Sequence, residues 1–576
     1  MATAAVDGEE TPSRWMELGK EALRKDDYPA AIGYFTKATR APDLQVHQEA
    51  LELLGLARER NGQMARAKSI YEEYLRLYPK GEDATRVRQR LAGLTTASLR
   101  PPGAKLKAPG DAESPGQWEY YGAISQYFRR DAGISDEEGE IIQHQSLNSF
   151  LDFTGKYRGS RYDFRFQFNG RYFEDFQNED RSGPRISYGY VDGADRELGI
   201  SGRLGRQTRS SGGVLGRFDG GALSYRISPH WQINVVGGQP VQPYLYRAGP
   251  TSDKSFYGFS LDFGPFFDHW AGNVFFIDQT ADGLSDRRAI GGEMRYLHPK
   301  FPTFALLDYD VMFSELNTAH LVSNWNFDDG ATGATAYVAL DYRKTPLLTT
   351  SNAIMGTGFD SVGDLRNSLT RSEIHKLARA QTATSKSVTV GGSVPISDKY
   401  QLNGDVTWAN LSGAGADLLS FWGKECFPAG IGPSTNTANG LCPPFMVGRY
   451  PGTGDEWSYG MQLVAHNLPM EGATTVFGLR YADRRDVDIA SLQLDTTYPI
   501  ADKWRIEPRF RFDHYSGAAD GDTVTVRPAL RLGYRPLKPL SLELESGFEW
   551  SSQPLFPGDV DDSKGYYFVL GYRLDF

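Results

Sequence analysis

The sequence of 576 residues contains no run of about 18 apolar residues, so we expect no transmembrane helix. This absence does not exclude a membrane barrel, because barrel strands give only a weak, alternating signal. The first residues, MATAAVDGEETPSR, include neither a basic nor an apolar segment, so no signal peptide is expected in this chain. A net charge of -10 argues against nucleic acid as a partner.

Catalytic and metal-binding patterns are lacking too. The nine histidines are scattered, and His375 in EIHKLARA has no second ligand at metal spacing. Glu543 and Glu545 share one face of a strand, whereas a glycosidase needs two carboxyl groups across a cleft. The glycine-rich GRLGRQTRSSGGVLGRFDG lacks the lysine and helix of a phosphate-binding loop and indicates a hairpin. We therefore expect no enzyme, no cofactor and no metal site.

The first part of the chain, from residue 12 to 95, is expected to be helical. Two segments follow the spacing of the tetratricopeptide repeat (TPR), whose period is about 34 residues. Small residues let the helices approach, and aromatic residues fill the space between them. The TPR positions are Trp15, Leu18, Gly19, Ala31, Phe35, Ala38, Leu51, Leu54, Gly55, Ala67, Tyr71 and Pro79. A third helix is expected over residues 83–94; the alternative is a generic helical hairpin.

Residues 96–116 are rich in proline, glycine and lysine and predict a flexible linker. From residue 117 to 576, apolar and polar residues alternate again and again. The segments RYDFRFQFNGRY, YQLNGDVTW, KWRIEPRFRFDH and LSLELESGFEW each place apolar residues on one face of a strand and polar residues on the other. The 63 glycines and abundant aromatics suit a barrel in which one of these faces meets lipid.

The links between strands favour a barrel over a soluble sandwich. Alternate links are short, as in RGSR, SPHW, SDKY, ADKW and LKPL. Several others are long: QPVQPYLYRAGPTSD, residues 347–384, residues 414–454 and SSQPLFPGDVDD. Short turns at one end and longer loops at the other are typical of bacterial outer-membrane barrels. The sequence thus predicts an α+β multidomain chain: helical repeats, then an antiparallel transmembrane barrel of about 22 strands, with about 16 to 20 as alternatives.

The chain ends on GYYFVLGYRLDF, one face of which is apolar and is expected to contact lipid. This ending resembles the C-terminal signal by which bacterial outer-membrane proteins are recognised for insertion, where a final phenylalanine is characteristic. The residues that match it are Tyr566, Phe568, Leu570, Tyr572, Leu574 and Phe576.

The TPR positions together with this last strand resemble the TPR-containing outer-membrane proteins that secrete exopolysaccharides such as cellulose or poly-N-acetylglucosamine. The resemblance implies a periplasmic TPR domain over residues 1–95, a linker over 96–116 and an outer-membrane barrel over 117–576. It also implies a periplasmic protein partner for the repeats and a polymer that passes through the barrel. The alternatives are a structural or assembly barrel without an open pore, and a general diffusion porin.

Charged residues on the polar strand faces are expected to line the lumen. They either brace the wall through cross-strand pairs or form a route for a charged or hydroxylated solute. The expected lumen residues are Asp163, Arg165, Glu293, Arg295, Asp308, Asp310, Arg505, Glu507, Arg509, Arg511, Arg527, Arg531, Glu543, Glu545, Glu549 and Arg573.

Two long loops have further features. In residues 347–384, Leu365, Leu369, Ile374 and Leu377 recur near helical spacing, and Ser372 with Glu373 suits a helix start. This helix either restricts the lumen or mouth of a wide barrel, or lies on the surface. The loop over 414–454 contains Cys426 and Cys442, which we expect to form a disulfide. Closing that loop would contribute roughly 3 kcal/mol.

Overall fold

A computed structural model describes most of the chain, and two compact units divide it at residue 112. The described residues are 11–24, 27–39, 43–61, 64–78, 87, 116–135, 139–214, 216–241, 253–327, 333–355, 359, 361–367, 369–415, 451–517, 521–555 and 559–576. No helix in these ranges is long and apolar enough to cross a membrane.

The first unit consists of paired helices, as the repeat spacing predicts. They are α1 (Pro12–Arg24), α2 (Tyr28–Ala38), α3 (Leu44–Arg60) and α4 (Met64–Leu77). Asp27 is the N-cap of helix α2, and its side chain accepts a hydrogen bond from Ala30 N at 3.2 Å. A proline lies in the first turn of the helix. Of the third helix expected over 83–94, only Val87 is described, and its side chain is buried against Tyr71 and Tyr74.

Each pair of helices is packed around one glycine and one aromatic ring. Phe35 and Tyr71 are fully buried, and a Cβ atom added to Gly19 or Gly55 would overlap the respective ring. The Tyr71 hydroxyl donates to Glu59 Oε2 at 2.7 Å, which fixes the ring in place. The glycines therefore allow the close helix approach that the repeat pattern requires. Pro79 lies outside the described residues.

Replacing Gly55 with alanine should destabilise this helical unit by about 1 to 3 kcal/mol, because the buried Tyr71 ring cannot move away from the new methyl group. Gly33 is the matched control, since it is exposed and a Cβ there meets nothing within 4 Å. Gly33→Ala should stabilise by up to about 1 kcal/mol through helix propensity. Thermal loss of helical circular dichroism in the full chain measures both; equal effects would contradict the packing argument.

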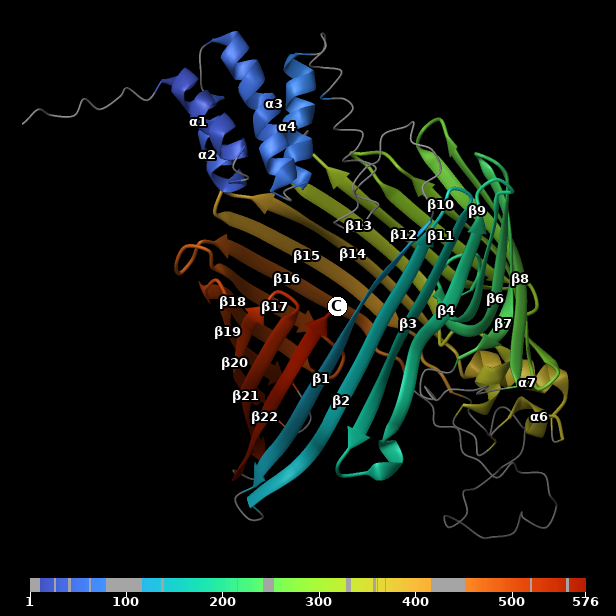
Figure 1. Cartoon of the computed structure of the whole chain (residues 1–576). Helices are drawn as coiled ribbons and strands as arrows, with labels where there is room; N and C mark the ends of the chain where they lie inside the picture. The colour runs from blue at the N-terminus through green and yellow to red at the C-terminus, as the bar shows by residue number, and fades with distance from the viewer. Residues whose placement is uncertain are drawn as a thin grey trace, which may run out of the picture. The chain divides into compact units, whose positions relative to one another are not determined.

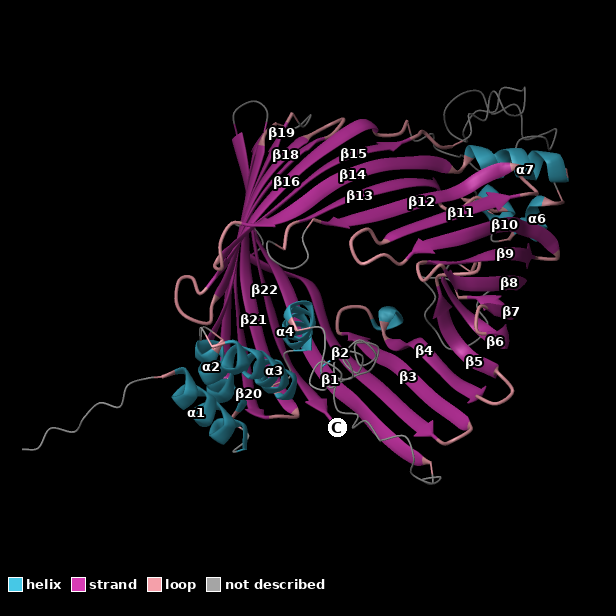
Figure 2. Cartoon of the chain, turned by 90° about the horizontal axis from the view of Figure 1, so that it is seen from above, coloured by secondary structure: helices cyan, strands magenta, loops and turns pink. Residues whose placement is uncertain are grey.

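The second unit is a closed antiparallel barrel of 22 strands, which confirms the predicted fold (Figure 1, Figure 2). The first eleven strands are β1 (Gln117–Ser135), β2 (Gly139–Arg158), β3 (Tyr162–Asp175), β4 (Gly183–Asp195), β5 (Ile200–Arg209), β6 (Gly216–Ser228), β7 (Trp231–Pro240), β8 (Lys254–Phe266), β9 (Trp270–Ala281), β10 (Leu284–Tyr296) and β11 (Thr303–Asp310). The others are β12 (Glu315–Asn326), β13 (Thr335–Thr345), β14 (Ala383–Pro395), β15 (Tyr400–Leu411), β16 (Gly454–His466), β17 (Thr474–Asp483), β18 (Asp488–Ala501), β19 (Trp504–Ser516), β20 (Thr523–Leu537), β21 (Leu540–Leu555) and β22 (Asp559–Asp575).

Closure joins the two ends of the sheet. Strand β1 pairs with β22 from Ala123↔Asp575 to Ile134↔Lys564, while its other edge pairs with β2. Beyond this ladder, Gly122 and Phe576 exchange backbone hydrogen bonds of 2.9 and 3.0 Å. The last residue of the chain thus takes part in the closing pair, and no edge strand is left open.

The short links form turns as predicted, and one of the expected long links does not form a loop; the link QPVQPYLYRAGPTSD lies mostly outside the described residues. The sequences RGSR, SPHW, SDKY, ADKW and LKPL all form turns at the end of the barrel where β1 begins and β22 ends. The segment expected as the long link SSQPLFPGDVDD is instead mostly strand, because β21 extends to Leu555 and β22 begins at Asp559. Antiparallel pairing from Ser551↔Ser563 to Leu555↔Asp559 satisfies its backbone groups. A short 3-10 helix, η1 (Glu179–Arg181), lies between β3 and β4.

The link between β13 and β14 folds into three short helical pieces rather than one. They are η2 (Thr350–Ile354), α6 (Val362–Leu365) and α7 (Arg371–Ala380). Helix α7 begins behind Thr370, not at Ser372, because Thr370 and Glu373 form a capping box. The predicted apolar residues Leu365, Leu369, Ile374 and Leu377 are buried together with Phe313 and Leu348. Helices α6 and α7 lie near the ends of β10 to β12 (Figure 2).

Two expectations concern residues that are not described. Cys426 and Cys442 lie within residues 416–450, so the disulfide stays a prediction. The linker expected over 96–116 likewise lies outside the described ranges, except for Gly116.

Candidate functional site: the inner wall of the barrel

The polar face of the strands is the inner face of the barrel. The link after β5 reaches as far as β10: Gly212 N donates to Glu293 Oε1 at 2.9 Å, and Arg287 Nη1 donates to Gly213 O at 3.1 Å. A short link can pass the strands in between only on the concave side of a curved sheet. Alternate residues of β10, Ile290 and Met294, are 48% and 39% exposed on the opposite, outer face.

Strands β19 to β21 carry a network of ion pairs on this inner face. Glu507 is paired with Arg505 at 2.7 Å and with Arg509 at 2.9 Å, and Arg531 is paired with Glu543 at 2.7 Å. Toward the other end of the barrel, Asp513 is paired with Arg511 at 2.9 Å and with Arg527 at 2.6 Å. Arg527 also contacts Glu549 at 2.6 Å, and Arg509 contacts Glu545 at 3.5 Å. Here the sequence-predicted lumen residues lie together as one group.

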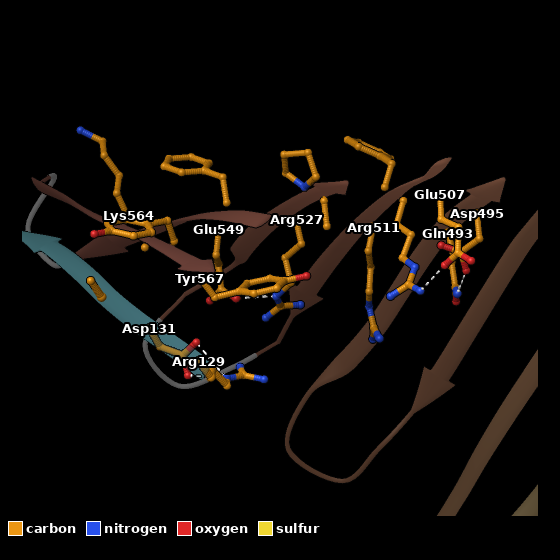
Figure 3. Close-up of a pocket in the computed structure, with 18 of the residues that line it drawn as sticks. Arg129, Asp131, Gln493, Asp495, Glu507, Arg511, Arg527, Glu549, Lys564 and Tyr567 are labelled. Carbon is orange, nitrogen blue, oxygen red and sulfur yellow. Dashed lines mark hydrogen bonds and ion pairs between the residues drawn. The ribbon is translucent and has the colours of Figure 1, made fainter. Parts of the chain in front are cut away.

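The two signs of charge are not equally exposed in this network. The side chains of Arg505 and Arg511 are 48% and 53% exposed, whereas those of Glu507 and Asp513 are 11% and 0% exposed. Figure 3 shows Arg511 and Arg527 projecting from neighbouring strands to the same side of the sheet, with Lys564 on the other side. Guanidinium groups therefore face the solvent inside the barrel, and most of the carboxylates lie closer to the wall. We call this surface the arginine strip: Arg505, Arg509, Arg511, Arg527 and Arg531.

The predicted residues on β3 are paired differently. Arg165 contacts Asp192 of β4 at 2.5 Å, and Arg203 of β5 contacts the same carboxylate at 2.5 Å. Asp163 is paired with Arg196 in the turn after β4, at 2.6 Å. The sequence analysis did not include Asp192 or Arg203, although each is a charged residue next to an apolar residue of its strand, Val191 and Leu204 respectively. Arg573 of β22 contacts Asp575 at 2.8 Å, near the end of the chain.

Three of the four predicted residues on β10 and β11 are less accessible than expected, while the side chain of the fourth, Arg295, is 47% exposed. Glu293 is 3% exposed and pairs with Arg295 at 3.0 Å; Asp308 is 1% exposed and pairs with Arg287. Asp310 is fully buried and accepts hydrogen bonds of 2.8 Å from the backbone N–H groups of Met312 and Phe313. Asp310 thus holds the turn between β11 and β12, and a solute inside the barrel could not reach its carboxylate.

A structural feature that sequence reasoning missed covers this part of the wall. Gly212 and Gly213 have φ values of 65° and 77°, which glycine adopts without strain, and a Cβ on Gly213 would overlap the Phe275 ring. The turn sets Val214 among Phe218, Val236, Phe256 and Ile277 in a buried cluster on the inner face. The glycine-rich segment does form the predicted hairpin, but its link folds inward. The pair of glycines in SSGG was the only available signal.

Metal-binding geometry is not found in the described part of the chain, where no group of three or more His, Cys, Asp or Glu side chains converges. His375 of α7 instead packs against Phe313, with 5.0 Å between ring centroids. Burial and the neighbouring Arg371 and Arg379 lower the pKa of His375. Glu373, by contrast, has its pKa lowered by hydrogen bonds from Thr370.

The packing of α7 should weaken as the pH falls below about 6.5, the ordinary histidine value. A histidine whose folded pKa is lowered binds its proton more tightly when unpacked, so acid favours the unpacked form. Glu373 keeps its charge through this range because its pKa is shifted downward. Hydrogen exchange over residues 362–380, corrected for intrinsic rates, should be faster at pH 5.5 than at pH 7.5 in the wild type and pH-independent in His375→Gln. The same pH dependence in both would rule out His375 as its source.

A comparison with known protein families supports the repeat. The Tetratricopeptide repeat family model matches residues 16–82. No curated protein matches the chain in sequence. The outer membrane protein opdK from Pseudomonas aeruginosa has 10% identity, a TM-score of 0.34, and coverage of 80% of this chain and 99% of its own. OccAB3 of Acinetobacter baumannii has 9% identity, a TM-score of 0.36, and coverage of 80% and 100%.

A BenF-like porin from Pseudomonas fluorescens Pf-5 has 12% identity, a TM-score of 0.34, and coverage of 80% of this chain and 99% of its own. Similarity at this level does not extend the functions of these proteins to the present chain. Its own topology defines it as a closed antiparallel barrel preceded by tetratricopeptide helices.

Proposed function

We propose that this protein is an outer-membrane channel whose repeat domain lies in the periplasm. The observation that carries the proposal is the division of the barrel into an apolar outer face and a charged, partly exposed inner face. Leu204, Leu223 and Leu570 are 70%, 55% and 52% exposed on the outside, an arrangement that only lipid makes favourable across so many strands.

Aromatic residues near both ends of the strands support a membrane location. At the end of the barrel where β1 begins and β22 ends, Trp118, Trp231, Trp270 and Trp504 are 40% to 48% exposed. At the other end, Trp457 is 41% exposed and stacks with Tyr459. Two belts of this kind mark the membrane interfaces of outer-membrane barrels.

The outer face gives a direct test of the membrane. Leu570→Arg should prevent assembly or cost about 2 to 4 kcal/mol, because it buries a cation in lipid. Val569 is the matched control, since it lies one residue away on the inner face, between Arg129 and Glu545 in the register of the neighbouring strands. Val569→Arg should be tolerated. Reversible unfolding in lipid vesicles measures both variants, and equal losses would contradict a lipid-facing Leu570.

The arginine strip suggests the class of cargo. Exposed guanidinium groups bind carboxylates, phosphates and hydroxyl groups, while the recessed carboxylates hold the arginines in place. A hydroxylated or acidic chain fits such a surface, so the finer proposal is export of a polymer of the exopolysaccharide type. A barrel that only anchors a complex, without an open pore, is the second candidate. A general diffusion porin is the third, and it leaves the repeat domain without a role.

Conductance in planar bilayers separates these candidates. An open channel should conduct, and Arg505→Gln/Arg511→Gln should lower its chloride permeability relative to potassium, read as a shift in reversal potential. Each carboxylate keeps a second arginine in this variant, because Glu507 still contacts Arg509 and Asp513 still contacts Arg527. Lys564→Gln, on the outer side of the sheet in Figure 3, should leave selectivity unchanged. Absence of conductance in the wild type would favour the anchoring barrel.

The polarity of the barrel supports the proposed periplasmic position of the repeats. Residue 116 enters β1 at the end where the turns are short, which is the periplasmic end in bacterial barrels. The repeat domain precedes β1, so it should lie on the same side. Tetratricopeptide stacks present concave helical surfaces suited to peptides or partner helices. We propose that residues 1–95 bind a periplasmic protein, while the barrel contacts outer-membrane lipid.

The helical link between β13 and β14 is proposed to restrict the pore, since a wide, unobstructed barrel would leak large solutes. Replacing residues 360–381 with a short Gly-Ser link should raise single-channel conductance and sensitivity to large antibiotics. If conductance and antibiotic sensitivity stay unchanged, the helices are a surface feature. The pore would then be restricted by residues 210–214 or by segments outside the described ranges.

A further inference from the structure

A small cavity lies apart from the arginine strip, between the β13–β14 link and the start of β10. It has a volume of about 250 Å³. Its lining residues are Leu284, Ser285, Thr350, Arg366, Leu369, Arg371, Ile374 and His375. We call it the α7 pocket. A water molecule takes up about 30 Å³, so the pocket has room for a tetrahedral anion and a short organic group.

The charge of the α7 pocket is positive. Arg366 and Arg371 line it, and no lining residue is an aspartate or glutamate. Within the described ranges, neither arginine forms an ion pair. Nearby carboxylates are bound elsewhere: Asp286 accepts from Ser351 N at 2.7 Å, and Glu373 accepts from Thr370 N at 2.8 Å. Two uncompensated guanidinium groups at one cavity favour an anionic occupant.

The pocket also contains polar atoms without hydrogen bonds. Ser285 Oγ and His375 Nε2 are buried, and each lacks a hydrogen-bond partner among the described residues. A buried polar atom without a partner is costly and uncommon in folded proteins. The Thr350 hydroxyl, which also lines the pocket, already donates to Ser285 O at 2.8 Å. The ring contact with Phe313, at 5.0 Å, holds His375 in place. An oxyanion could accept hydrogen bonds from both unpartnered groups, Ser285 Oγ and His375 Nε2.

We propose that the α7 pocket binds a phosphate-type oxyanion, held by Arg366 and Arg371 with hydrogen bonds from Ser285 Oγ and from His375 Nε2 in its N–H form. Leu284, Leu369 and Ile374 line the rest of the cavity and would contact the apolar part of an organic phosphate. The anion would tie the β13–β14 link to β10. Its source is either a soluble phosphorylated molecule or a lipid headgroup. This site is independent of the arginine strip and of the proposed transport.

Isothermal titration of the detergent-solubilised full chain with inorganic phosphate tests the soluble source. Wild-type protein should bind, and Arg366→Ala/Arg371→Ala should weaken binding at least about tenfold through the loss of two charged donors. Arg366→Lys/Arg371→Lys should give an intermediate affinity, because the charge remains. Lys376→Ala, which removes a positive charge from α7 outside the pocket lining, should bind as the wild type does. Circular dichroism of each variant checks that the barrel is intact.

Native mass spectrometry after reconstitution with phosphatidylglycerol tests the headgroup. Retention of this lipid by wild type and Lys376→Ala, but not by the arginine-to-alanine variant, would support a lipid source even where free phosphate does not bind. If the arginine-to-alanine variant binds as tightly as the wild type in both assays, the proposal is overturned. The absence of wild-type binding in both assays would overturn it too.

Discussion

Pairing between the first and last strands of the barrel is the constraint on which the other features depend. Because β1 and β22 join through residues up to Gly122 and Phe576, the sheet has no open edge. Closure gives the sheet a fixed inside and outside. Strict alternation then commits every second side chain to one of them, so a one-residue slip would turn Leu570 inward and Val569 outward. Closure thus fixes where charge can be placed.

The inner wall uses its charge in two different ways. Along β19 to β21, each of the carboxylates Glu507 and Asp513 lies between two arginines, so the anions are shielded and the cations remain accessible. Along β8 to β10, the inward link covers the wall, and Arg287 and Glu293 hydrogen-bond to its glycines. The first wall is available to a solute, whereas the second is a packed surface. The channel proposal therefore rests on one side of the barrel.

A barrel with a polar interior has no central apolar core, and this affects its longest described link. The apolar residues of α6 and α7 belong to a cluster separate from the one around Val214 on the inner face. They are buried against one another and against Phe313 and Leu348. Arg379 fixes α7 to the barrel through Glu315 at 2.8 Å and through the carbonyl oxygen of Phe313 at 2.9 Å. This self-contained packing leaves a cationic pocket beside β10 rather than a continuous core.

Periodicity in the sequence by itself determined the repeat helices, the large antiparallel barrel and the face of the strand residues away from β-bulges. These features depend on spacing along the chain, which is local information. The closing register, the inward course of residues 210–214 and the burial of Asp308 and Asp310 depend on contacts between distant strands. The odd or even position of a residue along its strand indicates which face of the sheet it occupies, but not which other residues cover that face. The same polar pattern therefore gave exposed arginines on β19 and β20 and buried aspartates on β11, and only the tertiary structure decided between them.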